Sequence, residues 1–105
     1  MKESVIQKAI MQYLQILENQ GKLYFFRAGS GAIPTGNGGY FKTGKVGCPD
    51  IVVCLRGLFV GLEIKNEKGR QSPSQKIAQE AIETAGGRYY IVRSVDDVER
   101  ILEEI

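Results

Sequence analysis

Apolar residues recur at spacings of three and four in three stretches of the chain, which is the pattern of a helix with one buried face. These stretches cover residues 3–20, about 73–85 and 95–105. Gly21 ends the first helix and the pair Gly86–Gly87 ends the second. Ser72 and Ser94 have the form of N-caps, and Pro73 with Gln75 completes a capping box at the second helix.

Four short apolar or aromatic runs alternate with these helices and predict strands at residues 22–27, 50–55, 58–65 and 88–93. Between the first two runs lies a glycine-rich loop, residues 28–48, with a short hairpin expected around Asn37–Gly38. The order is helix, strand, loop, strand, strand, helix, strand, helix. It predicts an α/β fold in which a mixed sheet is flanked by helices, and one domain covers residues 1–105.

The amino-acid composition limits which catalytic groups and metal ligands the chain can supply. The chain has no histidine and only two cysteines, so a structural zinc site or a Ser-His or Cys-His nucleophile is excluded, and any metal must be held by carboxylates. The two cysteines, Cys48 and Cys54, fit a reducing, cytoplasmic protein, and no apolar run approaches the length of a membrane span. The formal charge is +2, but residues 96–105 carry −4, which leaves +6 elsewhere. A basic body of this kind is compatible with binding a polyanion.

The candidate chemistry lies in the two central strands. A hairpin that turns at Arg56–Gly57 brings Asp50 beside Glu63 and Lys65, and alternation places Glu63 and Lys65 on one face. Two carboxylates suit a hard cation such as Mg²⁺, and a neighbouring lysine can orient or deprotonate a water. This predicts metal-assisted phosphodiester hydrolysis. The alternative is that Asp50 caps a turn and that the acid and lysine form a solvated strand end.

The glycine-rich loop adds exposed backbone amides, two aromatic residues and its only charges, Lys42 and Lys45. These are components of a loop that contacts phosphates and bases. The alternative is a mobile glycine-rich loop that binds nothing. Gly39 to Lys45 also spells the start of a phosphate-binding P-loop. The next residue is Val46 rather than Ser or Thr, and a strand follows instead of a helix, so no nucleotide cofactor is expected.

With Pro49-Asp50 and Glu63-x-Lys65 in this order of elements, the chain resembles the PD-(D/E)xK nuclease superfamily and, more closely, its VRR-NUC (virus-type replication-repair nuclease) family. The resemblance implies a restriction-endonuclease-like αβββαβ core. The further matching features are Glu3-x-x-x-Gln7, Arg27 before a Gly/Ser stretch, Gly47-x-Pro49-Asp50, Phe59 leading to Glu63-Ile64-Lys65, and Ser74-Gln75.

The resemblance also implies roles for these residues. Mg²⁺ or Mn²⁺ would be held by Asp50, Glu63 and the Ile64 carbonyl, with Lys65 on the attacking water. Glu3, otherwise explained as complementing the helix dipole, becomes a metal-site carboxylate, and Gln75 becomes a polar residue of the catalytic site. DNA contacts are expected from basic residues around this site: Arg27, Lys42, Lys45, Lys68 and Arg70.

The function implied is a metal-dependent, structure-specific DNA endonuclease. Small stand-alone viral relatives are similar to Holliday-junction resolvases, which implies a homodimer acting on branched, four-way DNA. Two alternatives stay open: a restriction-type or nicking nuclease on linear duplex, and a non-catalytic DNA-binding module of the same fold. The second leaves Asp50, Glu63 and Lys65 unexplained, because a carboxylate cluster without metal repels phosphate.

Overall fold

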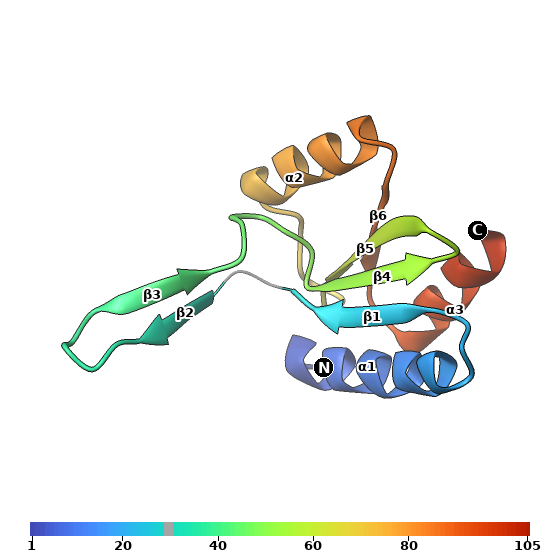
Figure 1. Cartoon of the computed structure of the whole chain (residues 1–105), viewed down its shortest axis with the longest axis horizontal. Coiled ribbons are helices and arrows are strands. Elements are labelled where there is room, and N and C mark those ends of the chain that lie inside the picture. The colour runs from blue at the N-terminus through green and yellow to red at the C-terminus, as the bar shows by residue number, and fades with distance from the viewer. Residues whose placement is uncertain (29–30) are drawn as a thin grey trace.

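A computed structural model describes the backbone of residues 1–28 and 31–105, without the side chains of residues 31–34 and 40–43. Figure 1 shows the elements in space. In chain order they are α1 (Glu3–Asn19), β1 (Tyr24–Arg27), β2 (Gly31–Pro34), β3 (Tyr40–Thr43), β4 (Ile51–Leu55), β5 (Leu58–Ile64), α2 (Pro73–Thr84), β6 (Arg88–Val92) and α3 (Val95–Glu104).

Four strands form one mixed sheet in the order β1-β4-β5-β6. β1 pairs antiparallel with β4, β4 pairs antiparallel with β5, and β6 lies parallel to β5 after the α2 crossover. The core is therefore α1-β1-β4-β5-α2-β6, followed by α3. This confirms the predicted αβββαβ order with a mixed sheet and flanking helices.

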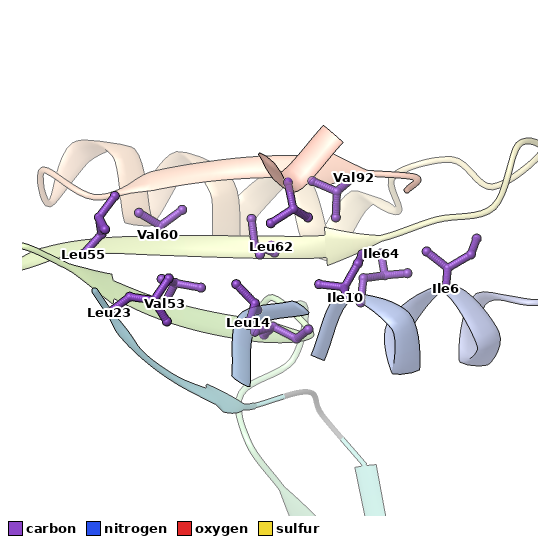
Figure 2. Packing of buried hydrophobic residues seen from close by; sticks show 12 residues of the cluster. Ile6, Ile10, Leu14, Leu23, Val53, Leu55, Val60, Leu62, Ile64 and Val92 are labelled. Carbon is purple, nitrogen blue, oxygen red and sulfur yellow. The ribbon is translucent and has the colours of Figure 1, made fainter. Parts of the chain in front are cut away.

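The hydrophobic core lies between this sheet and the helices α1 and α3. Figure 2 shows Ile6, Ile10 and Leu14 of α1 facing apolar side chains of the central strands. Those strand residues include Val53, Leu62 and Ile64, and Val98 of α3 is also fully buried. Each of these helix residues lies on the apolar stripe that the three-and-four spacing predicted, so local pattern and packing agree for α1 and α3.

The helix α2 departs from this pattern. Its stripe of Ile77, Ala78, Ala81, Ile82 and Ala85 was expected to be buried, yet no residue of α2 is buried, and Ile77 is 69% exposed. The helix itself forms as predicted, since Ser72 and Gln75 make a full capping box. The reason for the difference is coverage: α2 lies on the opposite side of the sheet from α1, and no other described element packs over its stripe (Figure 1).

The glycine-rich segment contains the predicted hairpin. β2 and β3 pair antiparallel, with Gly31 opposite Thr43 and Pro34 opposite Tyr40, and they form a separate two-stranded sheet. The turn between them holds Asn37–Gly38, and the Thr35 amide donates to the Gly39 carbonyl at 2.9 Å. Within the described residues, no helix is both long and apolar enough to cross a membrane.

Candidate nuclease site

The hairpin of β4 and β5 brings Asp50 and Glu63 together. Its two-residue turn, Arg56–Gly57, has positive φ at both positions, as a tight hairpin turn of this type requires. The pairing of Ile51 with Leu62 then places Asp50 opposite Glu63 at the open end of the hairpin. The Asp50 Oδ2 atom accepts a hydrogen bond of 2.8 Å from the Ile64 amide. This juxtaposition is the one expected from the sequence.

Two glycines allow the chain to approach the site closely. A Cβ atom on Gly61 would lie 2.5 Å from Pro49 Cγ, so only glycine lets Pro49 rest on β5. Gly47 has φ +77°, and a Cβ there would lie 2.2 Å from the Ser74 carbonyl oxygen at the start of α2. The spacing Gly47-x-Pro49-Asp50 thus has a physical meaning, because both contacts set where Asp50 enters the sheet.

Glu63 is a buried acid with few partners. It is only 3% exposed, and its Oε2 atom lies 3.9 Å from Lys65 Nζ. Its Oε1 atom is buried, and no hydrogen-bond partner for it exists among the described residues. A buried carboxylate oxygen without a partner is costly, and the usual resolutions are protonation or a bound cation.

The electrostatics of Glu63 follow from this burial. Burial first, then hydrogen bonding to Asp50 and the charge of that carboxylate, raises the pKa of Glu63 from 4.5 to about 8, although Lys65 acts in the opposite direction. The two carboxyl groups therefore repel each other when both are ionised. A divalent cation between them would remove that repulsion, so the donor set of Asp50, Glu63 and the Ile64 carbonyl fits an oxygen-liganded Mg²⁺ or Mn²⁺.

Glu3 contacts the turn that follows β5. Its Oε2 atom accepts a 3.5 Å hydrogen bond from the Asn66 amide in the turn after β5, and its charge contributes least to the pKa of Glu63. Across the part of the chain that the structure describes, no three acidic or cysteine side chains are grouped to hold a metal ion. The role of Glu3 as a metal ligand stays a prediction.

Gln75 serves the start of α2. Its Oε1 atom accepts a 2.8 Å hydrogen bond from the Ser72 amide, which is its half of the capping box. Its predicted role in the catalytic site is not tested by this contact and stays a prediction. Gln7, one turn after Glu3, places its amide nitrogen 4.0 Å from Met11 Sδ.

The basic residues predicted to bind DNA lie on four segments of the chain. Arg27 ends β1 opposite Ile51, next to Asp50, and is exposed. Lys68 and Arg70 are exposed in the turn after β5, and Lys45 is exposed in the segment that leads back to β4. Lys42 belongs to β3, and its side chain lies outside the described part of the structure.

Sequence reasoning missed Tyr89, which lies beside the carboxylates, and Arg93, which contacts the turn after β5. The Tyr89 hydroxyl is buried without a hydrogen-bond partner of normal geometry in the described chain. Burial raises the pKa of Tyr89 to about 12; the nearby Gln71 side chain acts in the opposite direction, and Glu63 and Asp50 add smaller increases. Tyr89 is thus a neutral donor next to the acids. The Arg93 guanidinium donates to the carbonyls of Asn66 and Gly69 and so fixes the turn after β5. No local pattern marks either residue, because the register of a parallel strand pair is set by the crossover.

Comparison with known proteins bears on the fold of the chain. No family model matches the sequence, and no curated protein matches it. A solved structure described as a VRR_NUC domain is similar to this chain with a TM-score of 0.65 and 22% sequence identity. The superposition covers 96% of this chain and 94% of that one. The resemblance inferred from the sequence is therefore confirmed at the level of the fold: the chain has the fold of a VRR_NUC domain.

Proposed function

We propose that this protein is a divalent-metal-dependent deoxyribonuclease that hydrolyses phosphodiester bonds. The observation that carries the proposal is the buried Glu63, which has one oxygen without a partner, beside Asp50 and within 3.9 Å of the Lys65 ammonium. A purely structural sheet has no reason to bury an acid in this way. A DNA-binding module without catalysis would be weakened by it, because ionised carboxylates repel phosphate.

Each residue of the site has a distinct role in this proposal. Asp50 and Glu63, with the Ile64 carbonyl, would hold Mg²⁺ or Mn²⁺, which when bound neutralises charge on the phosphate and lowers the pKa of water. The Asp50 carboxylate is aimed by its hydrogen bond to the Ile64 amide. Lys65 is half-buried at the end of β5, where its ammonium can hold the attacking water and stabilise negative charge that develops on the phosphate.

The substrate that we propose is branched DNA, with four-way junctions as the leading case. Exposed cations lie on separate segments, Arg27, Lys45, Lys68 and Arg70, and in this proposal they contact phosphates on more than one strand. Linear duplex, cut in the manner of a restriction or nicking enzyme, is the second candidate. The same carboxylate pair would serve both, so substrate geometry must be decided by experiment.

Two coordinated cuts in a junction need two sites, and we propose a homodimer built on α2. Ile77, Ala81 and Thr84 of this helix, with Ala85 directly after it, form an exposed stripe of apolar and small side chains that also borders Glu80. Beside it, a groove of about 300 Å³ lies between α2 and the sheet, bordered by the exposed Val46 and Phe59. An antiparallel copy of α2 would bring Lys76 next to Glu83 of the partner subunit, so the helix is complementary to itself in charge.

The decisive experiment compares cleavage of labelled linear, flap and four-way DNA of matched sequence with Mg²⁺, Mn²⁺ or a chelator. Asp50→Asn, Glu63→Gln and Lys65→Met should each lower turnover at least about 100-fold, the scale seen when one electrostatic group of an active site is lost. Asp96→Asn, an exposed acid on α3, is the matched control and should cleave like the wild type.

All four variants are purified in the same way as the wild type to exclude a contaminating nuclease. Wild-type cleavage that persists in the chelator, or near-normal turnover in Glu63→Gln, would remove the metal-nuclease proposal. Equal cleavage of linear and four-way DNA would leave nuclease activity standing and remove only the junction preference.

A further inference from the structure

The hairpin of β2 and β3 has no structural partner in the described part of the chain. Among the described residues its strands pair only with each other, and neither packs against another helix or strand. Figure 1 shows it projecting away from the body as a separate ribbon. An isolated two-stranded hairpin is marginally stable in water, and this one buries no residue of its turn, 35–39. We call residues 31–43 the arm.

Both ends of the arm lead to the proposed active site. On the entering side, the Ala28 amide donates a 2.8 Å hydrogen bond to the Asp50 carbonyl. On the returning side, the chain passes Gly47, which packs against the start of α2, and reaches Asp50 two residues after Cys48. The arm is therefore anchored beside the carboxylate that would face the scissile phosphate, and a duplex bound there must pass close to the arm.

The composition of the arm and of the residues that flank it favours binding to a polyanion. Residues 28–49 contain no acid, although the chain has 12, and their two charges are Lys42 and Lys45. The turn at the end of the arm, Thr35 to Gly39, consists of small or polar residues, and the Asn37 side chain accepts hydrogen bonds from Thr35 and Gly39. A tip without apolar side chains is a poor surface for a protein partner, whereas amides and hydroxyls suit base edges and phosphates.

We propose that the arm lies in the major groove of a duplex segment held at the Asp50–Glu63 site. The major groove, about 12 Å wide, accepts a two-stranded ribbon. From Gly31 to Asn37 the ribbon reaches ~20 Å at ~3.3 Å per residue, enough to cross from the cleaved strand into the groove. The arm thus positions the duplex relative to the cut, and the inference rests on the proposed nuclease function.

The test shortens the arm by replacing residues 32–42 with a two-residue Asn-Gly turn that joins Gly31 to Thr43. Because the arm packs on no other element, the melting temperature should change little. A second variant, Lys42→Ala with Lys45→Ala, removes only the charge. Its matched control is Lys8→Ala with Lys22→Ala, which removes the same charge from exposed positions on and after α1. Binding is measured in the Asp50→Asn background so that DNA stays intact.

Shortening should weaken binding to a labelled duplex at least about tenfold, and the double lysine variant should reduce the salt slope by about 2 relative to wild type. Dimethyl sulfate, which methylates guanine N7 in the major groove, should be blocked on one flank of the cut by the intact arm and not by the shortened one. Unchanged affinity and an unchanged methylation pattern would overturn the inference.

Sedimentation of the same variants tests the alternative that the arm binds a second copy of the chain instead of DNA. If shortening converts a dimer to a monomer while methylation protection persists, the arm binds a second copy and the DNA inference is wrong. Failure of the nuclease proposal is distinguishable from both results: the wild type would bind and protect DNA through its arm but would not cleave it in Mg²⁺ or Mn²⁺.

Discussion

At the scale of a single residue, burial determines the protonation state of Glu63. Its neighbours in β5 are apolar and fully covered, and the same cover leaves its Oε1 atom without a partner in the described chain. With a pKa of about 8, the Glu63 carboxyl group of the metal-free folded protein keeps its proton up to about pH 8. In the unfolded chain the same group loses its proton near pH 4.5. The raised pKa is thus a statement about stability as well as reactivity.

We predict that the stability of the metal-free protein falls as pH rises from about 5 to about 9. The folded pKa of Glu63 lies above the unfolded value, so its stabilising contribution is complete below pH 4.5 and is lost as pH rises through about 8. Glu63→Gln should remove this dependence and raise the melting temperature near pH 8.5 by ~5 °C or more. Thermal melts in a chelator measure both quantities.

Added Mg²⁺ or Mn²⁺ provides the control, because it should restore the melting temperature of the wild type at the higher pH and leave Glu63→Gln almost unchanged. A Glu63→Gln protein that melts below the wild type in chelator at pH 8.5 would contradict the assignment of Glu63 as a strained, buried acid.

At the scale of the elements, the contact between Pro49 and β5 decides where the Asp50 carboxylate lies. A methyl group at position 61 would come within 2.5 Å of the Pro49 ring, and that ring cannot rotate away as a flexible side chain would. We predict that Gly61→Ala lowers the free energy of unfolding by about 1–3 kcal/mol, the usual cost of overpacking. It should also reduce cleavage at least about tenfold in protein that remains folded, because Asp50 follows Pro49 directly.

Gly36→Ala is the stability control for this change, since nothing lies within 4 Å of a Cβ at that position and its φ is ordinary. Denaturant titration and turnover at a temperature well below the melting transition separate the two effects. A Gly61→Ala enzyme with normal turnover per folded molecule would show that the Pro49 contact does not position Asp50.

At the scale of the whole molecule, charge and apolar surface are separated. The acidic helix α3 lies at the far end of the molecule from the arm, and it packs with α1 rather than with α2 (Figure 1). The arm is therefore remote from the acids of α3, whereas Arg93 links Asp97 of α3 to the turn after β5 that carries Lys68 and Arg70. In the dimer proposal, the exposed stripe of α2 would receive a second copy.

We predict that the wild type sediments at twice the 11.6 kDa chain mass and that Ile77→Glu sediments as a monomer. Lys76→Glu alone should weaken the dimer by placing like charges together, whereas Lys76→Glu combined with Glu83→Lys should restore it. Ile16→Glu, at an apolar position of α1 that is also exposed, is the control and should stay dimeric. A wild type that is monomeric at micromolar concentration would remove the dimer proposal.

The elements of the fold and the pairing of the two acids were determined by the sequence, because both depend on neighbours along the chain. Capping by Ser72 and Ser94 and the stripes of α1 and α3 are local signals, and the structure realises them. The two-residue turn at Arg56–Gly57 sets the hairpin register, and that register alone carries Asp50 opposite Glu63.

Other features were decided only by the tertiary structure, because they depend on which element covers which face. The apolar stripe of α2 has the same period as that of α1, but α2 packs against β6 alone among the described elements, and none of its residues is buried. Three contacts depend on β6 lying parallel beside β5. Glu63 is buried there, Tyr89 lies close to the two acids, and Arg93 donates hydrogen bonds to the turn after β5. The detachment of the arm is of the same kind, since glycine-rich sequence predicts a hairpin but not whether it joins the main sheet.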